Sequence, residues 1–425
     1  MNREMKHSGI AWIGEIPKQW TVELLGNNVK LVDNPNSDCS EDNALQFKMG
    51  TIISKKHGDS KYNPLTLEAY NKVQEGDIVL NGLNLSFDFI SQRVGLVKEK
   101  GVITSAYLTI RPTKTLDSIY LTYLLKAYDC CKAFHGMGRG LRQTLSYKEL
   151  RYEKLIYPSL AEQKAIADFL DKKCEEIDEL VALQEKIIEE LKAYKQSVIT
   201  EAVCKGLNPN VPMKDSGVEW IGKMPIHWEI RRLKYIGKSE NGLTYSPNDL
   251  CDNSNDGILV LRSSNIQEGK LVFTDNVYVK DAPSILHVKK GDIILCSRNG
   301  SAALVGKSAI VNSDIYATFG AFMMRFRSNH HTDYIHYLLT AAVSQYKQLF
   351  STTTINQLTI GVFGNLGMPF VVSRIEQQEI ADYLDKKCSE IDQLISIKQQ
   401  KIVELKDYKK SLIYEYTTGK KEVKL

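Results

Sequence analysis

The chain has 425 residues, 43% hydrophobic and 25% charged, an ordinary composition for a soluble globular protein of two or three domains. Its net charge of +4 is too small to indicate a nucleic-acid partner, and no run approaches the roughly 18 apolar residues of a membrane span. The first residues lack the apolar stretch of a secretory signal, and the eight cysteines include no CxxC pair. We therefore expect a cytoplasmic protein with reduced thiols, no membrane contact and no metal site.

A short motif with tryptophan and proline opens the chain and returns near its middle. Residues 5–20 read MKHSGIAWIGEIPKQW and residues 213–228 read MKDSGVEWIGKMPIHW, an offset of 208. A second pair of near copies, from 161 and from 375, is offset by 214. So long a period indicates a duplicated domain and not a solenoid. All four tryptophans lie in the short motifs, and the same motif in both halves favours packing over stacking on a base.

The two long segments between motif and helix are predicted to share one α+β fold. GDIVL at 76–80 and GDIIL at 291–295 are matched turn-plus-strand elements, and YLTYLL from Tyr120 aligns with YIHYLL from Tyr334 as a helix. Outside such core-like positions the two segments diverge strongly. Two segments that share their core positions but differ elsewhere are expected if each recognises a different target.

Each half ends in a long helical pattern that begins with a capping box. Ser159 and Ser373 can accept a hydrogen bond from a first-turn amide while Glu162 or Glu376 reaches back. The two patterns share 23 identities over 40 aligned positions, and their apolar heptads predict an antiparallel coiled coil across a pseudo-twofold axis. Packing of each helix on its own domain is the alternative. The predicted seam is Leu170, Ile177, Leu180, Ile187, Leu191, Tyr194 and Val198 with Leu384, Ile391, Leu394, Leu405, Tyr408 and Leu412, interrupted by Lys398 and Lys401.

No catalytic constellation accompanies this organisation. The chain contains no Asx-Pro-Pro-aromatic tetrapeptide, no GxSxG and no HExxH. The stretch from Ser301 to Ser308 resembles a phosphate-binding loop, but Gly300 stands one residue too early, so a turn between strands is the better account. We expect no catalytic residue in this chain. An unrecognised nuclease centre is an alternative, and it predicts metal-dependent cleavage by the isolated chain.

With the repeat laid out, the chain resembles the DNA-specificity subunits of type I restriction–modification systems. The paired SGxxWIGxxPxxW motifs, the paired EQxxIAxxLDKKC helix starts and the two GDIxL strands carry the resemblance, which extends from end to end. It implies that each middle segment is a target recognition domain for one half of a split, asymmetric DNA site, with the coiled coil as a ruler between the halves.

The resemblance also implies a set of partners. The subunit would bind double-stranded DNA, two modification subunits that methylate adenine, and restriction subunits that hydrolyse ATP and cut. S-adenosylmethionine, ATP and Mg²⁺ would belong to those partners, which leaves no cofactor in this chain. A structural scaffold that holds methyltransferase subunits without base specificity is the second interpretation, and sequence-specific DNA binding by the assembled complex separates the two.

The expected fold is α+β, with two similar globular target recognition domains separated by two long antiparallel helices that form a coiled coil. The expected boundaries are 1–158 for the first domain, 159–207 for the first helix, 208–372 for the second domain, and 373–425 for the second helix and the tail.

Candidate DNA-binding residues come from stretches rich in side chains that can read bases. Arginine pairs best with guanine, and asparagine or glutamine with adenine. The glycine-alternating stretch 135–143 is locally basic, and an arginine–asparagine step after a strand offers similar chemistry in the second domain. Surface loops without DNA contact are the alternative in both places. The full set is Lys132, Arg139, Arg142, Gln143, Lys148, Arg298, Asn299, Asn356 and Gln357.

Overall fold

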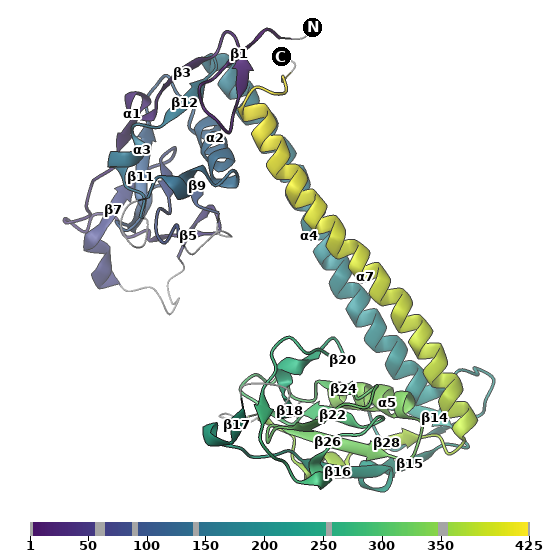
Figure 1. The fold of residues 1–425 in the computed structure, drawn as a ribbon. Coiled ribbons are helices and arrows are strands. Elements are labelled where there is room, and N and C mark those ends of the chain that lie inside the picture. Colours follow the sequence, from purple (N-terminus) through teal and green to yellow (C-terminus); the bar gives the residue numbers. More distant parts are fainter. Residues whose placement is uncertain are drawn as a thin grey trace. The chain divides into compact units, whose positions relative to one another are not determined.

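The computed structural model describes residues 3–55, 64–86, 92–138, 144–251, 257–346 and 356–423. The chain divides into two compact units, unit 1 (Met1–Glu185 with Gln399–Leu425) and unit 2 (Lys186–Lys398) (Figure 1). The division falls inside two long helices, α4 (Leu160–Lys205) and α7 (Arg374–Thr417), so each unit holds a globular domain and parts of both helices.

Unit 1 is built on a four-stranded antiparallel sheet with the strand order β4-β11-β8-β9. Its strands are β4 (Val29–Leu31), β8 (Ile78–Leu80), β9 (Val94–Leu96) and β11 (Leu108–Pro112), and helix α2 (Ser118–Cys130) packs on β9 and β11. Two-stranded pairings join β1 (Met5–His7) to β2 (Glu15–Pro17), β3 (Thr21–Leu24) to β12 (Lys154–Tyr157), β5 (Leu45–Lys48) to β6 (Thr51–Ser54), and β7 (Tyr70–Val73) to β10 (Gly101–Thr104). The short helices are α1 (Leu25–Asn28), η1 (Pro64–Ala69), η2 (Ala133–Gly136) and α3 (Tyr147–Leu150).

Unit 2 repeats this sheet with the strand order β16-β26-β22-β24. Its strands are β16 (Gly237–Asn241), β22 (Ile293–Cys296), β24 (Ser308–Ile310) and β26 (Met323–Ser328), with helix α5 (Thr332–Gln345) packed on β24. A second sheet contains β17 (Leu250–Cys251), β21 (Tyr278–Val279), β18 (Ile258–Leu261) and β25 (Ala317–Phe319) in that order. Pairs join β13 (Met213–Asp215) to β14 (Lys223–Pro225), β15 (Glu229–Arg232) to β28 (Gly367–Phe370), β19 (Ile266–Gln267) to β20 (Lys270–Leu271), and β23 (Arg298–Asn299) to β27 (Asn356–Gln357). The short helices are η3 (Leu233–Tyr235), η4 (Pro247–Asp249), η5 (Ser263–Asn265), η6 (Ser284–Leu286) and α6 (Ile360–Asn365). The prediction of one α+β fold used twice is confirmed.

The matched GDIxL elements form an inner strand of each sheet, and their aspartates show why. The glycine before each aspartate has a φ of +88° or +89°, which turns the chain into the strand. Asp77 is fully buried and accepts two hydrogen bonds from Arg111, at 2.6 and 2.8 Å. In unit 2, Asp292 accepts two from Arg327, at 2.6 and 2.7 Å. Each buried carboxylate is thus satisfied by an arginine of the neighbouring strand.

The tryptophan motifs fasten each domain to the start of a long helix. Trp20 and Trp228 have no exposed surface, and each donates its indole N–H to a glutamate, Glu162 or Glu376, at 2.9 Å. The serine half of each predicted capping box is present, but the glutamate serves the indole, which corrects the prediction that it reaches back. A buried indole N–H needs an acceptor, so the tryptophans pack and do not stack on bases.

Removing the Glu376 carboxylate is expected to destabilise unit 2 by about 1–2 kcal/mol, because a buried indole N–H loses its acceptor. Glu376→Gln keeps an acceptor oxygen and should cost less than Glu376→Ala. The check is chemical denaturation of both variants, and equal losses would show that the indole hydrogen bond contributes little.

Two equivalent ion pairs show that α4 and α7 are antiparallel within each unit. In unit 1, Lys409 Nζ lies 2.7 and 2.6 Å from the two carboxylate oxygens of Asp178. In unit 2, Lys195 Nζ lies 2.7 Å from both carboxylate oxygens of Asp392. Lys195 and Asp178 are separated from their counterparts in the second repeat by the same 214 positions. The predicted antiparallel pairing is confirmed.

The register of the predicted seam needs correction. Leu180, Tyr194, Leu394 and Tyr408 are about half exposed, with 46%, 58%, 47% and 54% of their surfaces accessible. The seam runs instead through the next residue in each helix, Lys195 and Lys409, whose side chains are half-buried. The face with 4–3 spacing, all buried or half-buried, is Leu170, Cys174, Ile177, Val181, Gln184, Ile188, Leu191, Lys195 and Val198 in α4, and Leu384, Cys388, Ile391, Ile395, Lys398, Ile402, Leu405, Lys409 and Leu412 in α7.

The other predicted seam residues differ in their places. Leu170, Ile177, Leu191, Leu384, Ile391, Leu405 and Leu412 lie on the 4–3 face, as does Lys398. Ile187 is half-buried beside Ile188, and Lys401 is exposed with an ion pair to Glu404 at 3.6 Å.

The C-terminal end of each long helix enters a domain core. In unit 1, Leu412 and Ile413 of α7 lie in the main hydrophobic cluster, and the hydroxyl of Tyr120 donates to the carbonyl of Thr417 at 3.3 Å. In unit 2, Val203 and Cys204 of α4 are buried in the corresponding cluster. Each helix therefore begins at one domain and ends in the core of the other.

Candidate nucleic-acid interface

Four of the predicted DNA-binding residues come together in unit 2 on one two-stranded ribbon. Strand β23 pairs with β27 in antiparallel register, so that Arg298 lies opposite Gln357 and Asn299 lies opposite Asn356. These two stretches are more than fifty residues apart in the sequence. A two-stranded ribbon is one of the elements that fit the major groove of B-form DNA.

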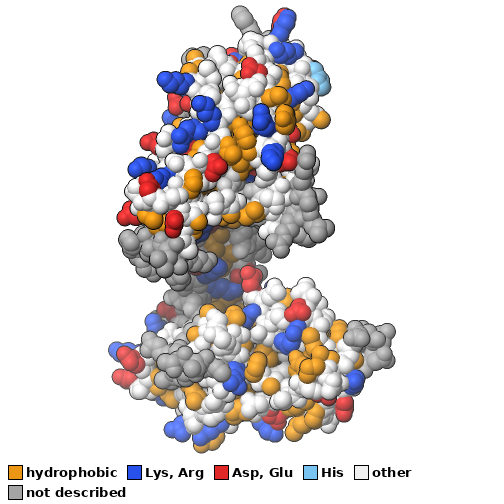
Figure 2. All heavy atoms as spheres, turned by 90° about the vertical axis from the view of Figure 1, so that its left-hand side faces the viewer, with side chains coloured by type: hydrophobic (Ala, Val, Ile, Leu, Met, Phe, Trp, Pro, Cys, Tyr) orange, Lys and Arg blue, Asp and Glu red, His pale blue; other side chains and the backbone are white. Residues whose placement is uncertain are grey.

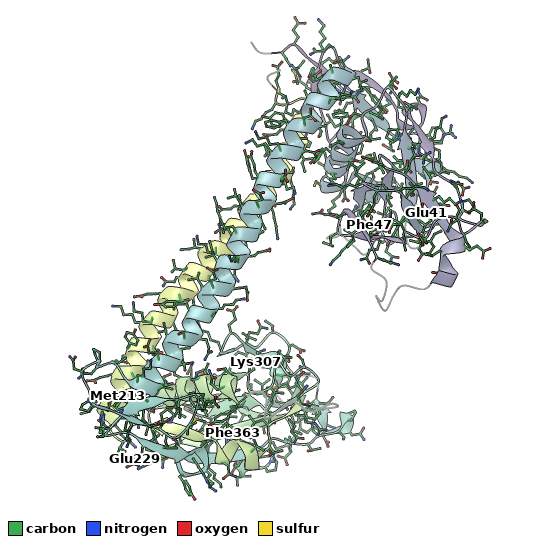
Figure 3. All side chains as sticks on the ribbon, turned by 180° about the vertical axis from the view of Figure 1, so that it is seen from behind. Glu41, Phe47, Met213, Glu229, Lys307 and Phe363 are labelled. Carbon is green, nitrogen blue, oxygen red and sulfur yellow. The ribbon has the colours of Figure 1, made fainter. Side chains whose placement is uncertain are left out.

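The ribbon is held at its base by backbone hydrogen bonds. The amide of Leu358 donates to the carbonyl of Ser297 at 2.8 Å, and the amides of Ser297 and Arg298 donate to the carbonyl of Phe322 at 2.9 and 3.1 Å. Beyond the ribbon, α6 is anchored by Phe363, which is labelled in Figure 3 and packs edge-on against Phe326 in the unit 2 core. The ribbon therefore extends from a fixed scaffold.

The two faces of the ribbon differ in what their side chains do. Asn299 Oδ1 accepts from the amide of Ser301 at 2.9 Å, and Asn356 Nδ2 donates to the carbonyl of Gly300 at 3.2 Å. Asn299 also hydrogen-bonds the Cys296 thiol, whose pKa is raised chiefly by burial. The two asparagines are thus used within the turn and the adjoining buried strand.

Arg298 and Gln357, on the other face, make no side-chain hydrogen bond or ion pair with any residue that the structure describes. The Arg298 guanidinium lies 5.5 Å from the ring centre of Phe322, a side chain that is 60% exposed. Figure 2 shows hydrophobic side chains exposed among lysines and arginines on the face of unit 2 that it presents. Phe322 was missed by the sequence reasoning, because a single phenylalanine before a strand carries no motif.

The candidates of unit 1 are less completely placed. Lys132 has a φ of +59° at the end of α2, and Lys148 is exposed on α3. Arg139, Arg142 and Gln143 lie outside the described residues.

Unit 1 nevertheless contains the base of the same ribbon. The amide of Leu145 donates to the carbonyl of Gly82 at 2.9 Å, just as that of Leu358 donates to Ser297. The positions of Arg298 and Gln357 are consequently taken in unit 1 by Leu83 and Thr144. An alignment of the two GDIxL segments already places Leu83 against Arg298, which is the signal that sequence alone could have given.

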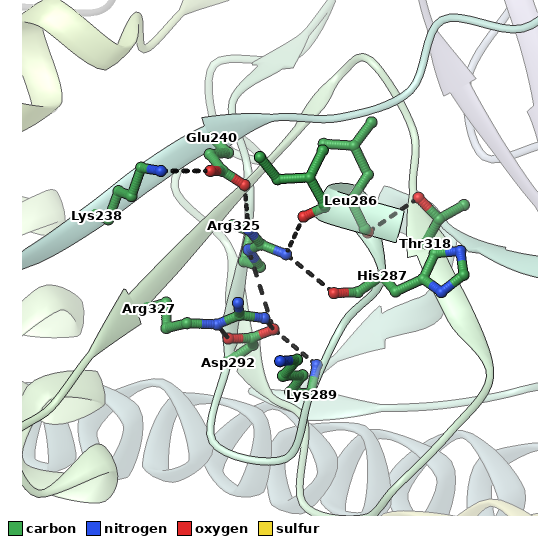
Figure 4. Close-up of polar contacts among 10 residues, drawn as sticks. Lys238, Glu240, Leu286, His287, Lys289, Asp292, Thr318, Arg325 and Arg327 are labelled. Carbon is green, nitrogen blue, oxygen red and sulfur yellow. Dashed lines mark hydrogen bonds and ion pairs between the residues drawn. The ribbon is translucent and has the colours of Figure 1, made fainter. Parts of the chain in front are cut away.

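A buried charge network supports strand β26, which follows Phe322 (Figure 4). Arg325 is ion-paired with Glu240, lies 4.0 Å from Asp292, and donates to the carbonyls of Ile285 and His287 at 3.0 Å each. Burial lowers the pKa of Arg325 from its ordinary value, whereas the hydrogen bond to Asp292 raises the pKa of the neighbouring Arg327. The network ties β16, β22, β26 and the loop at 284–288 together.

Two further searches concern the described residues alone. Every described helix is too short or too polar to cross a membrane. Among the same residues, no three histidine, cysteine, aspartate or glutamate side chains are grouped closely enough to hold a metal ion.

Comparison with known proteins adds a family to this geometry. The family model for the type I restriction modification DNA specificity domain matches residues 225–407. The chain is 25% identical over 430 residues to the specificity subunit of type I restriction enzyme MjaVIII from Methanocaldococcus jannaschii, covering 96% of this chain and 94% of that one. It is 26% identical over 206 residues to the EcoKI specificity subunit of Escherichia coli K12, covering 47% of this chain and 44% of that one.

Solved structures share the fold. A chain from a structure described as the "Structural basis underlying complex assembly and conformational transition of the type I R-M system" aligns with a TM-score of 0.72 at 14% identity, covering 95% of this chain and 98% of that one. The HsdS subunit of Thermoanaerobacter tengcongensis aligns with a TM-score of 0.51 at 14% identity, with the same coverage.

The family match defines a DNA specificity domain at residues 225–407. The chain as a whole is similar to specificity subunits of type I restriction–modification systems, and solved structures share its fold. Such subunits are the non-catalytic, DNA-recognising components of those systems and act with other subunits and DNA. This similarity agrees with the prediction that the chain is not itself an enzyme.

Proposed function

We propose that residues 1–158 and 208–372 are two target recognition domains, each reading one half of a bipartite, asymmetric DNA site. The observation that carries this proposal is one sheet used twice with different side chains at the same ribbon position. Unit 2 places Arg298 and Gln357 there, and unit 1 places Leu83 and Thr144. Different side chains on a shared scaffold suit two different half-sites.

The two long helices set the spacer between the half-sites in this proposal. Each helix begins at one domain and ends in the core of the other, so both of its ends are held by packing. A helix of about 45 residues is about 68 Å long, at ~1.5 Å per residue. A fixed rod between two readers gives a fixed number of unread base pairs.

The chain also docks two adenine-methylating modification subunits and ATP-dependent restriction subunits in this proposal. Exposed apolar side chains recur at equivalent places on the helices, Leu180 with Leu394 and Tyr194 with Tyr408, and such side chains suit contact with partner helices. S-adenosylmethionine, ATP and Mg²⁺ would then belong to the partners, and the complex would act in the cytoplasm.

The test is to co-express the chain with its modification subunit in a host without adenine methylation and to map methylated adenines across the genome. We expect a single bipartite motif with a fixed spacer. Exchanging residues 30–158 for those of another specificity subunit should change one half of the motif, and exchanging residues 237–372 should change only the other half.

The same experiment tests the scaffold interpretation. A stable complex with the modification subunit that methylates without sequence preference would favour a scaffold over a reader. Changes in both halves of the motif after either exchange would contradict the assignment of one half-site to each domain.

A further inference from the structure

We propose that Arg298 reads a guanine and Gln357 an adenine in the major groove of the second half-site, with Phe322 positioning the Arg298 guanidinium. The inference rests on the proposed function and adds to it the base chemistry of one domain. It follows from the pairing register, from the hydrogen bonds that the four ribbon side chains make, and from the position of the exposed Phe322 ring.

The pairing register places the four side chains on two opposite faces of the ribbon, and the side chains of only one face hydrogen-bond the adjoining turn. Successive residues of a strand point to opposite faces, and residues directly opposite each other share a face. Arg298 and Gln357 therefore lie side by side on one face, and Asn299 and Asn356 on the other. The asparagines bond the turn at Ser301 and Gly300, so the ribbon side chains without a hydrogen-bond partner among the described residues are those of Arg298 and Gln357.

The chemistry of this pair is specific. Arginine can donate two parallel hydrogen bonds to O6 and N7 of guanine, and the glutamine amide can donate to N7 and accept from N6 of adenine. Opposite residues of an antiparallel pair are about 5 Å apart, and stacked bases about 3.4 Å. The two bases therefore belong to neighbouring base pairs, or to pairs separated by one other.

Phe322 makes the arginine a better reader. Its carbonyl accepts from the Arg298 amide at 3.1 Å, and its ring lies 5.5 Å from the guanidinium, so backbone and side chain both fix the arginine. A guanidinium over a ring face keeps its in-plane donors free for a bidentate contact. Elsewhere in unit 2, Arg231 lies over Phe370 at 4.9 Å but is ion-paired with Glu229 at 2.9 Å.

The test measures methylation of duplexes by the complex with the modification subunit, with each base pair of the second half-site replaced in turn. In the unaltered complex, replacing the guanine read by Arg298 should lower methylation about 10- to 100-fold, the range of one bidentate pair. Arg298→Leu, which installs the residue found at this place in unit 1, should abolish the preference at that position. Preferences in the first half-site should remain.

Two further variants test the roles of the neighbours. Gln357→Glu removes the amide donor and should exchange the preference at its position from adenine to cytosine, because a carboxylate accepts from the cytosine amino group. Phe322→Leu should weaken guanine discrimination several-fold, and Phe322→Tyr should restore it. A purely structural role of Phe322 would instead change thermal stability without changing base preference.

Arg231→Leu is the matched control, since it also removes an arginine that lies over a phenylalanine, and it should leave all preferences unchanged. If Arg298→Leu weakens methylation equally for every sequence, Arg298 contacts phosphate and the inference is overturned. Unchanged second half-site preferences in Arg298→Leu would overturn it too. Absence of any bipartite preference in the unaltered complex would instead contradict the proposed function.

Discussion

Replacing Arg325 by methionine is expected to lower the free energy of unfolding of unit 2 by about 3 kcal/mol, because the Glu240 carboxylate would keep only the exposed Lys238, 3.1 Å away, as its ion-pair partner. Arg325 is 3% exposed, and its partner Glu240 is 15% exposed. The carbonyls of Ile285 and His287 would also lose their donor. Hydrogen exchange of β26 amides measures the effect, with β11 of unit 1 as an internal reference that should not change.

The matched control is the double substitution Glu240→Val with Arg325→Met. Unit 1 has Val32 and Thr109 at these two places, joined by a hydrogen bond from the amide of Val32 to the carbonyl of Thr109 at 2.9 Å, so the fold accepts an uncharged pair there. The double variant should recover most of the lost protection, since the carboxylate that lost its buried partner is gone while the methionine retains most of the arginine's volume. A double variant as unstable as the single one would show that the carbonyl contacts, and not the ion pair, account for the loss.

The sequence was sufficient to predict the scaffold. Both GDIxL segments became inner strands of matching sheets because a turn glycine, a buried aspartate and an apolar run are local features. Packing of Trp20 and Trp228 was also predicted, from their recurrence in both halves. The hydrogen bonds from the two indoles to Glu162 and Glu376 were not predicted, because a glutamate at the third helical position suits both a capping box and an indole partner.

The coiled-coil register was predicted only in part, because periodicity weighs apolar character alone. Tyr194 and Tyr408 are amphipathic and stand on the exposed side. Lys195 and Lys409 occupy the seam because their amines reach aspartates of the other helix. A long lysine stem packs along apolar surface while its charge is paired at the edge, which a hydrophobic pattern does not register.

The candidate site shows a different limit. Arg298, Asn299, Asn356 and Gln357 were each selected for their chemistry, and the structure brings them together. Which two of them lack a hydrogen-bond partner among the described residues depends on the pairing register between distant stretches, and a one-residue slip would reverse the faces. Sequence alone therefore predicts which residues offer the chemistry but not on which face of the ribbon each side chain lies.

Ile391→Asp is expected to destabilise the helix pair by about 3–5 kcal/mol and to disturb target spacing. Ile391 is 4% exposed on the 4–3 face of α7, where an added carboxylate has no partner and must be buried or force the helices apart. Circular dichroism on heating measures the first effect. The methylation map of the complex measures the second, as loss of the motif or as a mixed spacer length.

Leu394→Asp, three residues further along the same helix, is the matched control. Leu394 is 47% exposed, so its carboxylate would stay in water and change stability by no more than about 0.5 kcal/mol. If modification subunits bind the exposed apolar side chains, Leu394→Asp should weaken their binding while leaving the isolated chain stable. Equal stability of both variants, with an unchanged spacer, would show that the packed seam does not set the distance between the half-sites. A spacer that changes with Ile391→Asp alone would identify the buried face of the helix pair as the ruler.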